Sequence, residues 1–380
     1  MITNLKSQTE LSGFYIIYDG SANLEKKGIR GMTHLSEHLM CKSYEHLEKD
    51  LERCGIVSNA YTSNNEVVYF ITGLDDQVVK FRETILNCLI GFIPTEEQFL
   101  HEKKIVIEEY MDYFNMQTYA HALNLNRKLF DDYDPIGSLE DLQSMTYQDL
   151  VEYLTKYYSR PSRVINVSKN SDFISDIEFN KIKVDREFSY VKEPSDVIYE
   201  MNNDFNDKTS IICIGQLVQE DFAIVDFITE MLAGGLQSPL YQEVREKRGL
   251  SYGVSCSIHR INDKGVITIS VLTSNENSDE VVKTIEMVLN DPDTYLTQER
   301  FDIVKESSLI RLKKREINLY NNISEYIEPA SWSLKDKINT LTLEKVRQVY
   351  NKYFKFDSFY VSLDKEEFSE VEEILKGINE

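Results

Sequence analysis

The stretch from Gly31 to Met40 reads Gly-Met-Thr-His-Leu-Ser-Glu-His-Leu-Met, and it places two histidines and a glutamate within five residues. Residues three and four positions apart share one face of a helix, so His34, Glu37 and His38 are predicted to point into the same small volume. Two imidazoles at this spacing can bind one Zn²⁺, and the carboxylate beside them can accept a proton from an attacking water molecule. The order His-x-x-Glu-His is the inverse of the commoner His-Glu-x-x-His helix of metalloproteases. A helix that carries two histidines by chance is the competing interpretation, because catalytic zinc usually has three protein ligands.

A long helix that is predicted to begin at residues 94–95 supplies candidates for the third ligand. On a helical wheel, its apolar face contains Phe99, Ile105, Val106, Tyr110 and Tyr113. Glu102 and Glu109 fall on this same face, seven residues apart, whereas Glu108 points away from it. A carboxylate in an apolar stripe is costly unless a cation or a hydrogen-bond donor pairs with it. We therefore expect Glu109 to be the third ligand and Glu102 to contact one of the ligands without binding the metal itself. The alternative is that either carboxylate reaches solvent at the edge of the apolar stripe.

The bulk properties of the chain narrow the classes of function. A length of 380 residues exceeds what one hydrophobic core usually supports, so two domains are expected. The net charge of −22 argues against nucleic acid and anionic membrane surfaces as partners. The five cysteines are scattered, and neither a signal peptide nor a membrane span is evident in the sequence, so free thiols and a cytoplasmic location are expected.

The second half of the chain repeats the first half in outline. Each half is predicted to contain a strand, helices and a hairpin, the hairpins lying at residues 57–72 and 252–272. The segment Leu-Thr-Gln-Glu-Arg-Phe at 296–301 echoes Pro-Thr-Glu-Glu-Gln-Phe at 94–99. This pattern indicates an internal duplication of an α+β unit.

The two predicted domains differ in their metal-binding residues. We expect a zinc-binding catalytic domain at residues 1–190 and a metal-free second domain at residues 191–380. Aligning Phe301 on Phe99 puts Val304 and Arg311 at the positions of the two glutamates of the first half.

Taken together, these motifs resemble the insulinase, pitrilysin and mitochondrial processing peptidase family of zinc peptidases. Beyond the His-x-x-Glu-His helix, Glu102-x6-Glu109 resembles the family's downstream pair, whose second glutamate binds zinc. Residues 59–63, Asn-Ala-Tyr-Thr-Ser, resemble the strand that pairs with bound peptide, and residues 134–138, Asp-Pro-Ile-Gly-Ser, resemble a family turn. In the second half, residues 232–252 are similar to a family signature in which the positions of Arg245 and Tyr252 contribute to the active site.

The resemblance implies a fold and an activity. Its members have two similar α+β domains, each an antiparallel sheet covered by helices, although no clear strand is predicted here before Gly13. It implies a zinc-dependent endopeptidase in which Glu37 is the general base and then the acid. The substrate, a peptide or short unfolded segment, would pair with a strand containing Asn59, Ala60 and Tyr61.

The resemblance also bears on assembly. Members of this size form half of a clamshell, so a chamber made by two chains is expected. A homodimer is the simpler assembly, and a heterodimer with a related chain is the other. Two alternatives remain: a catalytically inactive structural or binding subunit on the same fold, and a helix-rich interaction protein with a chance motif. Zinc content separates the first alternative from an active peptidase.

Overall fold

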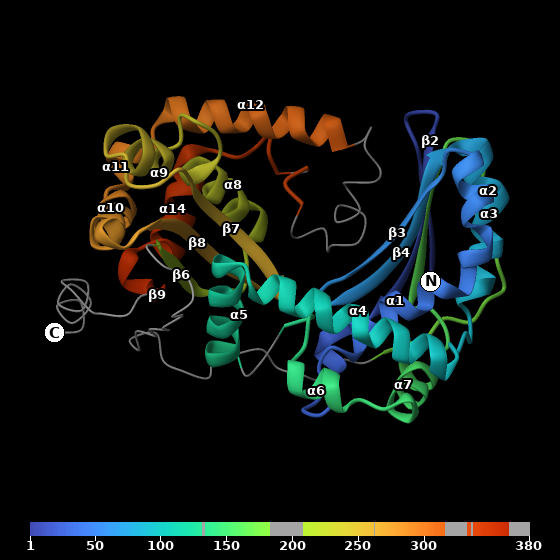
Figure 1. The fold of residues 1–380 in the computed structure, drawn as a ribbon. Helices are drawn as coiled ribbons and strands as arrows, with labels where there is room; N and C mark the ends of the chain where they lie inside the picture. The colour runs from blue at the N-terminus through green and yellow to red at the C-terminus, as the bar shows by residue number, and fades with distance from the viewer. Residues whose placement is uncertain (131–133, 183–207, 262, 316–332, 336, 365–380) are drawn as a thin grey trace. The chain divides into compact units, whose positions relative to one another are not determined.

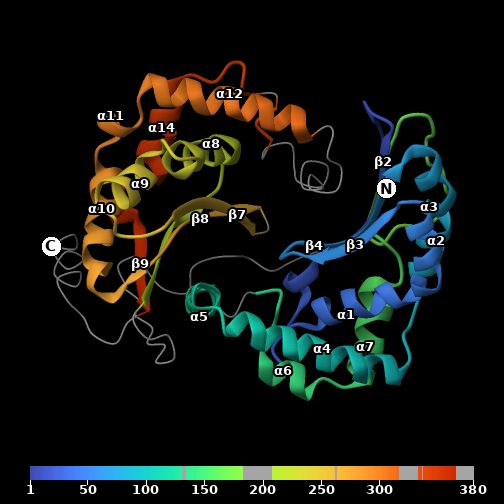
Figure 2. The same ribbon diagram turned by 45° about the horizontal axis from the view of Figure 1, so that its top comes forward.

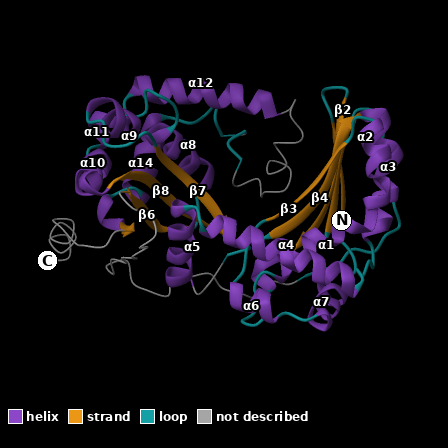
Figure 3. Cartoon of the chain, viewed as in Figure 1, coloured by secondary structure: helices purple, strands orange, loops and turns teal. Residues whose placement is uncertain are grey.

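The computed structural model describes residues 1–130, 134–182, 208–261, 263–315, 333–335 and 337–364. These residues form two compact units. The first is built from the described residues of 1–113, 134–182 and 313–315, and the second from those of 114–130, 208–312 and beyond 332. Each unit combines helices with a sheet (Figure 3), which confirms the predicted α+β class. The predicted domain boundary at 190/191 lies outside the described residues.

The sheet of the first unit has the strand order β1-β5-β2-β4-β3. Figure 1 labels its strands β2, β3 and β4. Its strands are β1 (Ile2–Lys6), β2 (Leu11–Asp19), β3 (Val57–Thr62), β4 (Glu66–Leu74) and β5 (Arg163–Ser168). Neighbouring strands run antiparallel except β1 and β5, which are parallel. The predicted hairpin of β3 and β4 is confirmed. The expectation of no clear strand before Gly13 is wrong, because β1 is held by pairing with a distant strand although three of its five residues are exposed.

Helices cover one face of this sheet. They are η1 (Ser21–Leu24), α1 (Met32–Cys41), η2 (Lys42–Leu47), α2 (Glu48–Arg53), α3 (Asp75–Leu89), α4 (Glu96–Phe114), α6 (Leu139–Ser144), α7 (Tyr147–Tyr153) and the π-helical turn η3 (Leu154–Tyr158). Tyr18 of β2 stacks on Tyr158 of η3 with ring centroids 4.9 Å apart, so this side chain points to the helices. Its neighbour Ile17 points to the opposite face, where it joins a separate buried cluster with Tyr15 and Phe70.

Strand β3 forms one of the two edges of this sheet, and its one partner among the described strands is β4. The amide of Ser63 donates to the carbonyl of Glu66 across the turn, so these two residues form a hydrogen-bonded pair. Bonded and non-bonded pairs alternate along an antiparallel ladder. The backbone N–H and C=O groups of Thr62, Ala60 and Ser58 therefore face the open edge.

Two glycines let the loop before α1 pack tightly against the segment that precedes α6. Gly31 caps α1 with φ of 92°, and Gly137 has φ of 81°. A Cβ added at Gly137 would stand 2.4 Å from the carbonyl oxygen of Arg30 and from Cα of Gly31. This close approach gives a physical reason for the glycine of the turn at residues 134–138.

Carboxylates fix the same loop by accepting backbone hydrogen bonds. Buried Glu25 accepts from the amides of Gly31 and Thr33, at 2.8 and 2.7 Å, which satisfies donors in the first turn of α1. Asp141 accepts from the amides of Gly28 and Arg30, at 2.8 and 3.0 Å. The start of α1 is therefore held from two sides.

The second unit contains a sheet with the strand order β7-β8-β6-β9, all antiparallel. Its strands are β6 (Lys208–Val218), β7 (Val254–Ile261), β8 (Lys264–Ser274) and β9 (Phe359–Asp364). Its helical segments are α5 (Gln117–Phe130), α8 (Phe222–Ala233), α9 (Pro239–Tyr241), the π-helical turn η4 (Gln242–Lys247), η5 (Asn275–Asn277), α10 (Ser278–Asn290), α11 (Pro292–Tyr295), α12 (Gln298–Arg315), α14 (Leu343–Tyr353) and η7 (Phe356–Ser358).

Helix α5 comes from the first half of the sequence but packs on the second sheet. In β9, Val361 and Leu363 belong to the core beneath α8 and α14, so Ser362 faces the other side of the sheet. His121 of α5 hydrogen-bonds Ser362 at 2.7 Å, and Gln117 reaches Asp364 at 3.2 Å. Figure 2 shows α5 on the side of the sheet opposite to α8 and α14.

The described helices include none that is both long enough and apolar enough to span a bilayer.

Candidate active site

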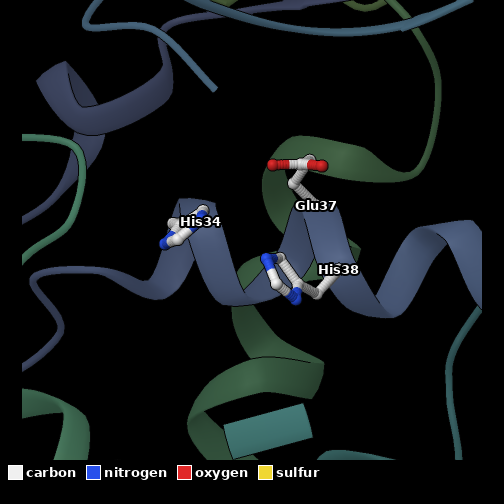
Figure 4. A group of neighbouring side chains, drawn as sticks. All are labelled: His34, Glu37 and His38. Carbon is white, nitrogen blue, oxygen red and sulfur yellow. The ribbon is translucent and has the colours of Figure 1, made fainter. Parts of the chain in front are cut away.

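Helix α1 brings the first three predicted site residues together. Ligand atoms of His34, Glu37 and His38 all lie within 4.8 Å of one another, and Figure 4 shows them projecting from successive turns of the same helix. Met32, Leu35 and Leu39 occupy the buried face of α1. The helical period therefore leaves the three polar side chains together on a half-buried face.

Helix α4 adds Glu109 to this group. Its Oε2 atom lies 3.6 Å from Nε2 of His34 and 3.4 Å from Nε2 of His38. Two donor atoms each about 2.1 Å from a tetrahedral zinc ion would be roughly 3.4 Å apart. The distances from the Glu109 carboxylate to the two imidazoles therefore match the spacing of ligands on one zinc ion.

Glu37 is also near the two histidines, but its surroundings suit a different role. Its Oε2 atom accepts a hydrogen bond from the hydroxyl of Thr62 in β3, at 3.2 Å. By contrast, one oxygen of Glu109 is almost equidistant from both imidazole Nε2 atoms. This geometry favours Glu109 as a third ligand and would leave Glu37 beside a bound ion.

Glu102 lies behind His38. Its side chain is 5% exposed, and its Oε2 atom is 3.4 Å from Nδ1 of His38. A carboxylate at Nδ1 orients the ring and leaves Nε2 available to a metal. The predicted position of Ile105 on the buried face of α4 is wrong, because this side chain is 41% exposed.

Burial sets the protonation of the site. Loss of solvent, aided by the neighbouring His38, lowers the pKa of His34 to about 4, so this imidazole is neutral at neutral pH, as a metal ligand must be. Burial raises the pKa of Glu37, while His38 and the hydrogen bond from Thr62 act in the opposite direction. A raised pKa makes a carboxylate a stronger base at neutral pH.

The predicted substrate strand is the edge strand β3, next to α1. Tyr61 packs with the cluster on the sheet face away from α1, whereas Thr62 reaches Glu37 on the near face. The backbone amide of Ala60 donates to the side-chain oxygen of Asn59 at 2.9 Å. The amide of Ala60 is thus not bonded to β4, as expected for an amide that faces the open edge of the sheet.

The second unit brings Arg245 and Tyr252 into contact with each other. The Arg245 guanidinium carbon lies 4.4 Å from the Tyr252 ring centroid and 4.9 Å from that of Tyr241. Arg245 also donates to the carbonyl oxygen of Tyr252 at 3.2 Å. The Tyr252 side chain is 85% exposed, so a stacked arginine and an exposed phenol stand together on the surface of this unit.

The second unit has an ion pair where the first has the metal-site residues. Asp226 and Glu230 of α8 have the same i, i+4 spacing as the two histidines of α1. Arg311 of α12, at the position aligned with Glu109, pairs with Glu230 at 2.5 Å and lies 4.0 Å from Asp226. An arginine thus joins α12 to α8.

Several contacts at these sites were not expected from the sequence. Lys42 pairs with Glu102, Thr62 bonds Glu37, and Tyr241 stacks on Arg245. A sequence signal exists for Lys42 and Tyr241, since each is four residues from a predicted site residue, the spacing of neighbours on a helix. Glu25, which accepts hydrogen bonds from the amides of Gly31 and Thr33, has no such spacing to a predicted site residue.

Two models of one peptidase family match this chain. A family model described as "Insulinase (Peptidase family M16)" matches residues 5–134, and one described as "Peptidase M16 inactive domain" matches residues 144–308. The uncharacterized zinc protease YmxG of Bacillus subtilis strain 168 is 24% identical over 283 residues, which cover 70% of this chain and 69% of that protein.

Solved structures share the fold. A protease from Helicobacter pylori aligns with a TM-score of 0.79 and 18% identity, over 96% of this chain and 97% of the other. A chain of complex III2 from Candida albicans aligns with a TM-score of 0.76 and 10% identity, over 99% and 97%.

Proposed function

Because the chain belongs to the insulinase family of peptidases, family M16, we propose that it is a zinc-dependent endopeptidase. Its substrates would be peptides or short unfolded protein segments. The observation that carries this proposal is the convergence of Nε2 of His34, Nε2 of His38 and Oε2 of Glu109, with distances of 3.4 and 3.6 Å from the carboxylate to the imidazoles. Glu37 lies beside these atoms and is not needed as a ligand.

In this proposal His34, His38 and Glu109 hold Zn²⁺. When bound, the ion would polarise the scissile carbonyl as a Lewis acid and would lower the pKa of the attacking water, so that the water can lose a proton at neutral pH. Glu37 takes the proton from the attacking water and later delivers it to the leaving amine. Thr62 holds the Glu37 carboxylate in place through its hydroxyl.

The peptide would bind as an added strand along β3. The outward N–H and C=O groups of Ser58, Ala60 and Thr62 offer main-chain hydrogen bonds, and Thr62 joins this edge to Glu37. In bound peptide, the amide of Ala60 would exchange its bond to Asn59 for one to the substrate. Main-chain pairing gives affinity with little dependence on substrate sequence.

The direct test is a digest of a mixed peptide library by parent protein, with and without a chelator, read by mass spectrometry. Glu37→Gln should retain zinc and lose at least about a hundredfold in cleavage rate, because the base is not a ligand. The exposed Glu52 offers a matched control, and Glu52→Gln should cleave like the parent. Loss of zinc in Glu37→Gln, or activity within about tenfold of the parent, would contradict the assignment.

Arg245 and Tyr252 are proposed to donate hydrogen bonds to the substrate carbonyl, each worth on the order of a hundredfold in rate. We propose a homodimer that encloses the substrate in a chamber. Inactive Glu37→Gln protein mixed with inactive Arg245→Ala/Tyr252→Phe protein should then recover activity, provided that subunits exchange. Demonstrated exchange without recovery would count against a site shared between chains.

An inactive structural or binding subunit is the second candidate function. The likeness to a chain of complex III2 supports it, since that chain belongs to a larger assembly. Parent protein that binds no zinc and cleaves no peptide would favour it. For location we propose the cytoplasm, because all five cysteines are free thiols, as a reducing compartment would keep them.

A further inference from the structure

A chain of three charged or ionisable side chains runs from the candidate metal ligand His38 to the end of helix α1. Nδ1 of His38 lies 3.4 Å from Oε2 of Glu102, and Oε1 of the same carboxylate lies 3.1 Å from Nζ of Lys42. The two oxygens of Glu102 therefore face different partners. One partner is a candidate ligand, and the other is a permanent cation.

The burial of Glu102 explains why a cation is needed there. Its side chain is 5% exposed, whereas those of Lys42 and His38 are 31% and 23% exposed. A buried carboxylate is strongly unfavourable unless it is paired and hydrogen-bonded. Across the part of the chain that the structure describes, the ion pairs of Glu102 are those with His38 and Lys42, and the lysine places a full positive charge beside this buried carboxylate.

The local fold brings Lys42 to this position. Lys42 follows directly on α1 and begins η2, four residues after His38, so both side chains leave the helix on the same side. Glu102 comes from α4, the helix that also carries Glu109. The ion pair between Lys42 and Glu102 thus ties together the two helices that carry the three candidate ligands.

We propose that Lys42 is a positioning residue for the metal centre, which fixes the Glu102 carboxylate so that Glu102 in turn holds the His38 ring with Nε2 toward Glu109. This inference rests on the proposed function. A Lys42 that only balances surface charge would affect neither the metal affinity nor the effect of Glu102 on it.

The test measures the affinity for Zn²⁺ itself, by competition with a chromogenic chelator, and needs no peptide substrate. Removing a carboxylate that orients a metal ligand typically costs 10- to 100-fold in affinity. Lys42 acts one step further away, so Lys42→Met and Lys42→Gln should each weaken zinc binding about tenfold. Lys42→Arg should restore most of the affinity. The matched control is Lys49→Met, which removes an exposed lysine from the next helix and should leave the affinity unchanged. Melting of each zinc-free variant checks that it is folded.

A double-mutant cycle shows whether Lys42 acts through Glu102. In a Glu102→Gln background, Lys42→Met should cause little further loss of zinc affinity. Parent-like affinity of Lys42→Met and Lys42→Gln, or a full additional loss in the Glu102→Gln background, would overturn this inference while the zinc site stands. Parent protein that binds no zinc would overturn the proposed function, and this inference with it.

Discussion

Replacing Gly137 by alanine tests how closely the packing at the start of α1 controls the metal centre. The new Cβ would stand 2.4 Å from three backbone atoms, the carbonyl oxygen of Arg30 and the N and Cα atoms of Gly31. Gly31 is the cap of α1, and His34 follows three residues later. Relief of the overlap must therefore move the beginning of the helix that carries the candidate ligands.

Two costs combine in this variant. A residue with a side chain at φ of 81° costs roughly 1–2 kcal/mol, and overpacking against backbone that cannot rotate away adds roughly 1–3 kcal/mol. Gly55 offers a matched control, because its φ is 64° but an added Cβ would meet nothing within 4 Å. Gly55→Ala should therefore be destabilised only by the unfavourable φ and not by overpacking.

The assay compares the two alanine variants by thermal melting without metal and by zinc competition. For a unit of this size, 1 kcal/mol lowers the melting temperature by about 2–4 °C. Gly55→Ala should melt a few degrees below the parent and bind zinc normally. Gly137→Ala should melt lower still, by roughly 5–15 °C, and should bind zinc at least about tenfold more weakly. Equal melting temperatures and equal zinc affinities in the two variants would refute the view that this contact sets the position of α1.

Two further predictions concern carboxylates. In a calorimetric titration, Glu109→Gln should reduce zinc affinity about a hundredfold or more, and Glu102→Gln should have a smaller effect. The control Glu108→Gln should have no effect, since Glu108 is exposed. Equal affinities for the Glu109 and Glu108 variants would show that the wrong carboxylate was chosen. Burial raises the pKa of Glu25 from 4.5 to about 7, although the hydrogen bonds from the backbone amides at the start of α1 act to lower it. Between these two pH values, the folded protein therefore retains a proton that the unfolded chain has lost. The contribution of Glu25 to stability therefore falls as pH rises through this window, and the stability of the parent relative to Glu25→Gln should drop by on the order of 3 kcal/mol between pH 4 and pH 8 in denaturant titrations of zinc-free protein; a difference that does not change with pH would contradict this.

Local sequence patterns predicted the elements that carry the site. The i, i+3, i+4 spacing within residues 34–38 predicted helix α1 and its shared face, and two strand-like runs on either side of the turn residues 63–65 predicted the β3–β4 hairpin. These features depend on neighbours within a few residues, which a sequence displays directly. The helical wheel gave the direction of the buried stripe of α4 but not its width, so Ile105 was placed inside although it is exposed.

The remaining features depend on contacts between distant residues. Strand β1 is specified by pairing with β5, about 160 residues away, rather than by its own partly exposed residues. Helix α5 packs on β9 through His121 and Ser362, which are 241 residues apart. The four-residue spacing places Lys42 on the same side of the helix as His38, but the partner of Lys42 is Glu102, which comes from the distant helix α4. A periodic pattern in one segment cannot show which distant segment completes it.

In the proposed function, the two halves of this duplicated chain differ in how their stability depends on the supply of metal, because Arg311 joins α12 to α8 in the second half. A metal ion is exchangeable, and it stabilises a folded unit by an amount that grows with its free concentration. Arg311 is covalently attached, so the cation between Asp226 and Glu230 is always present and no chelator can withdraw it. In the proposed function, metal starvation would therefore remove a stabilising cation from the first half alone, while the ion pair of the second half would be unaffected.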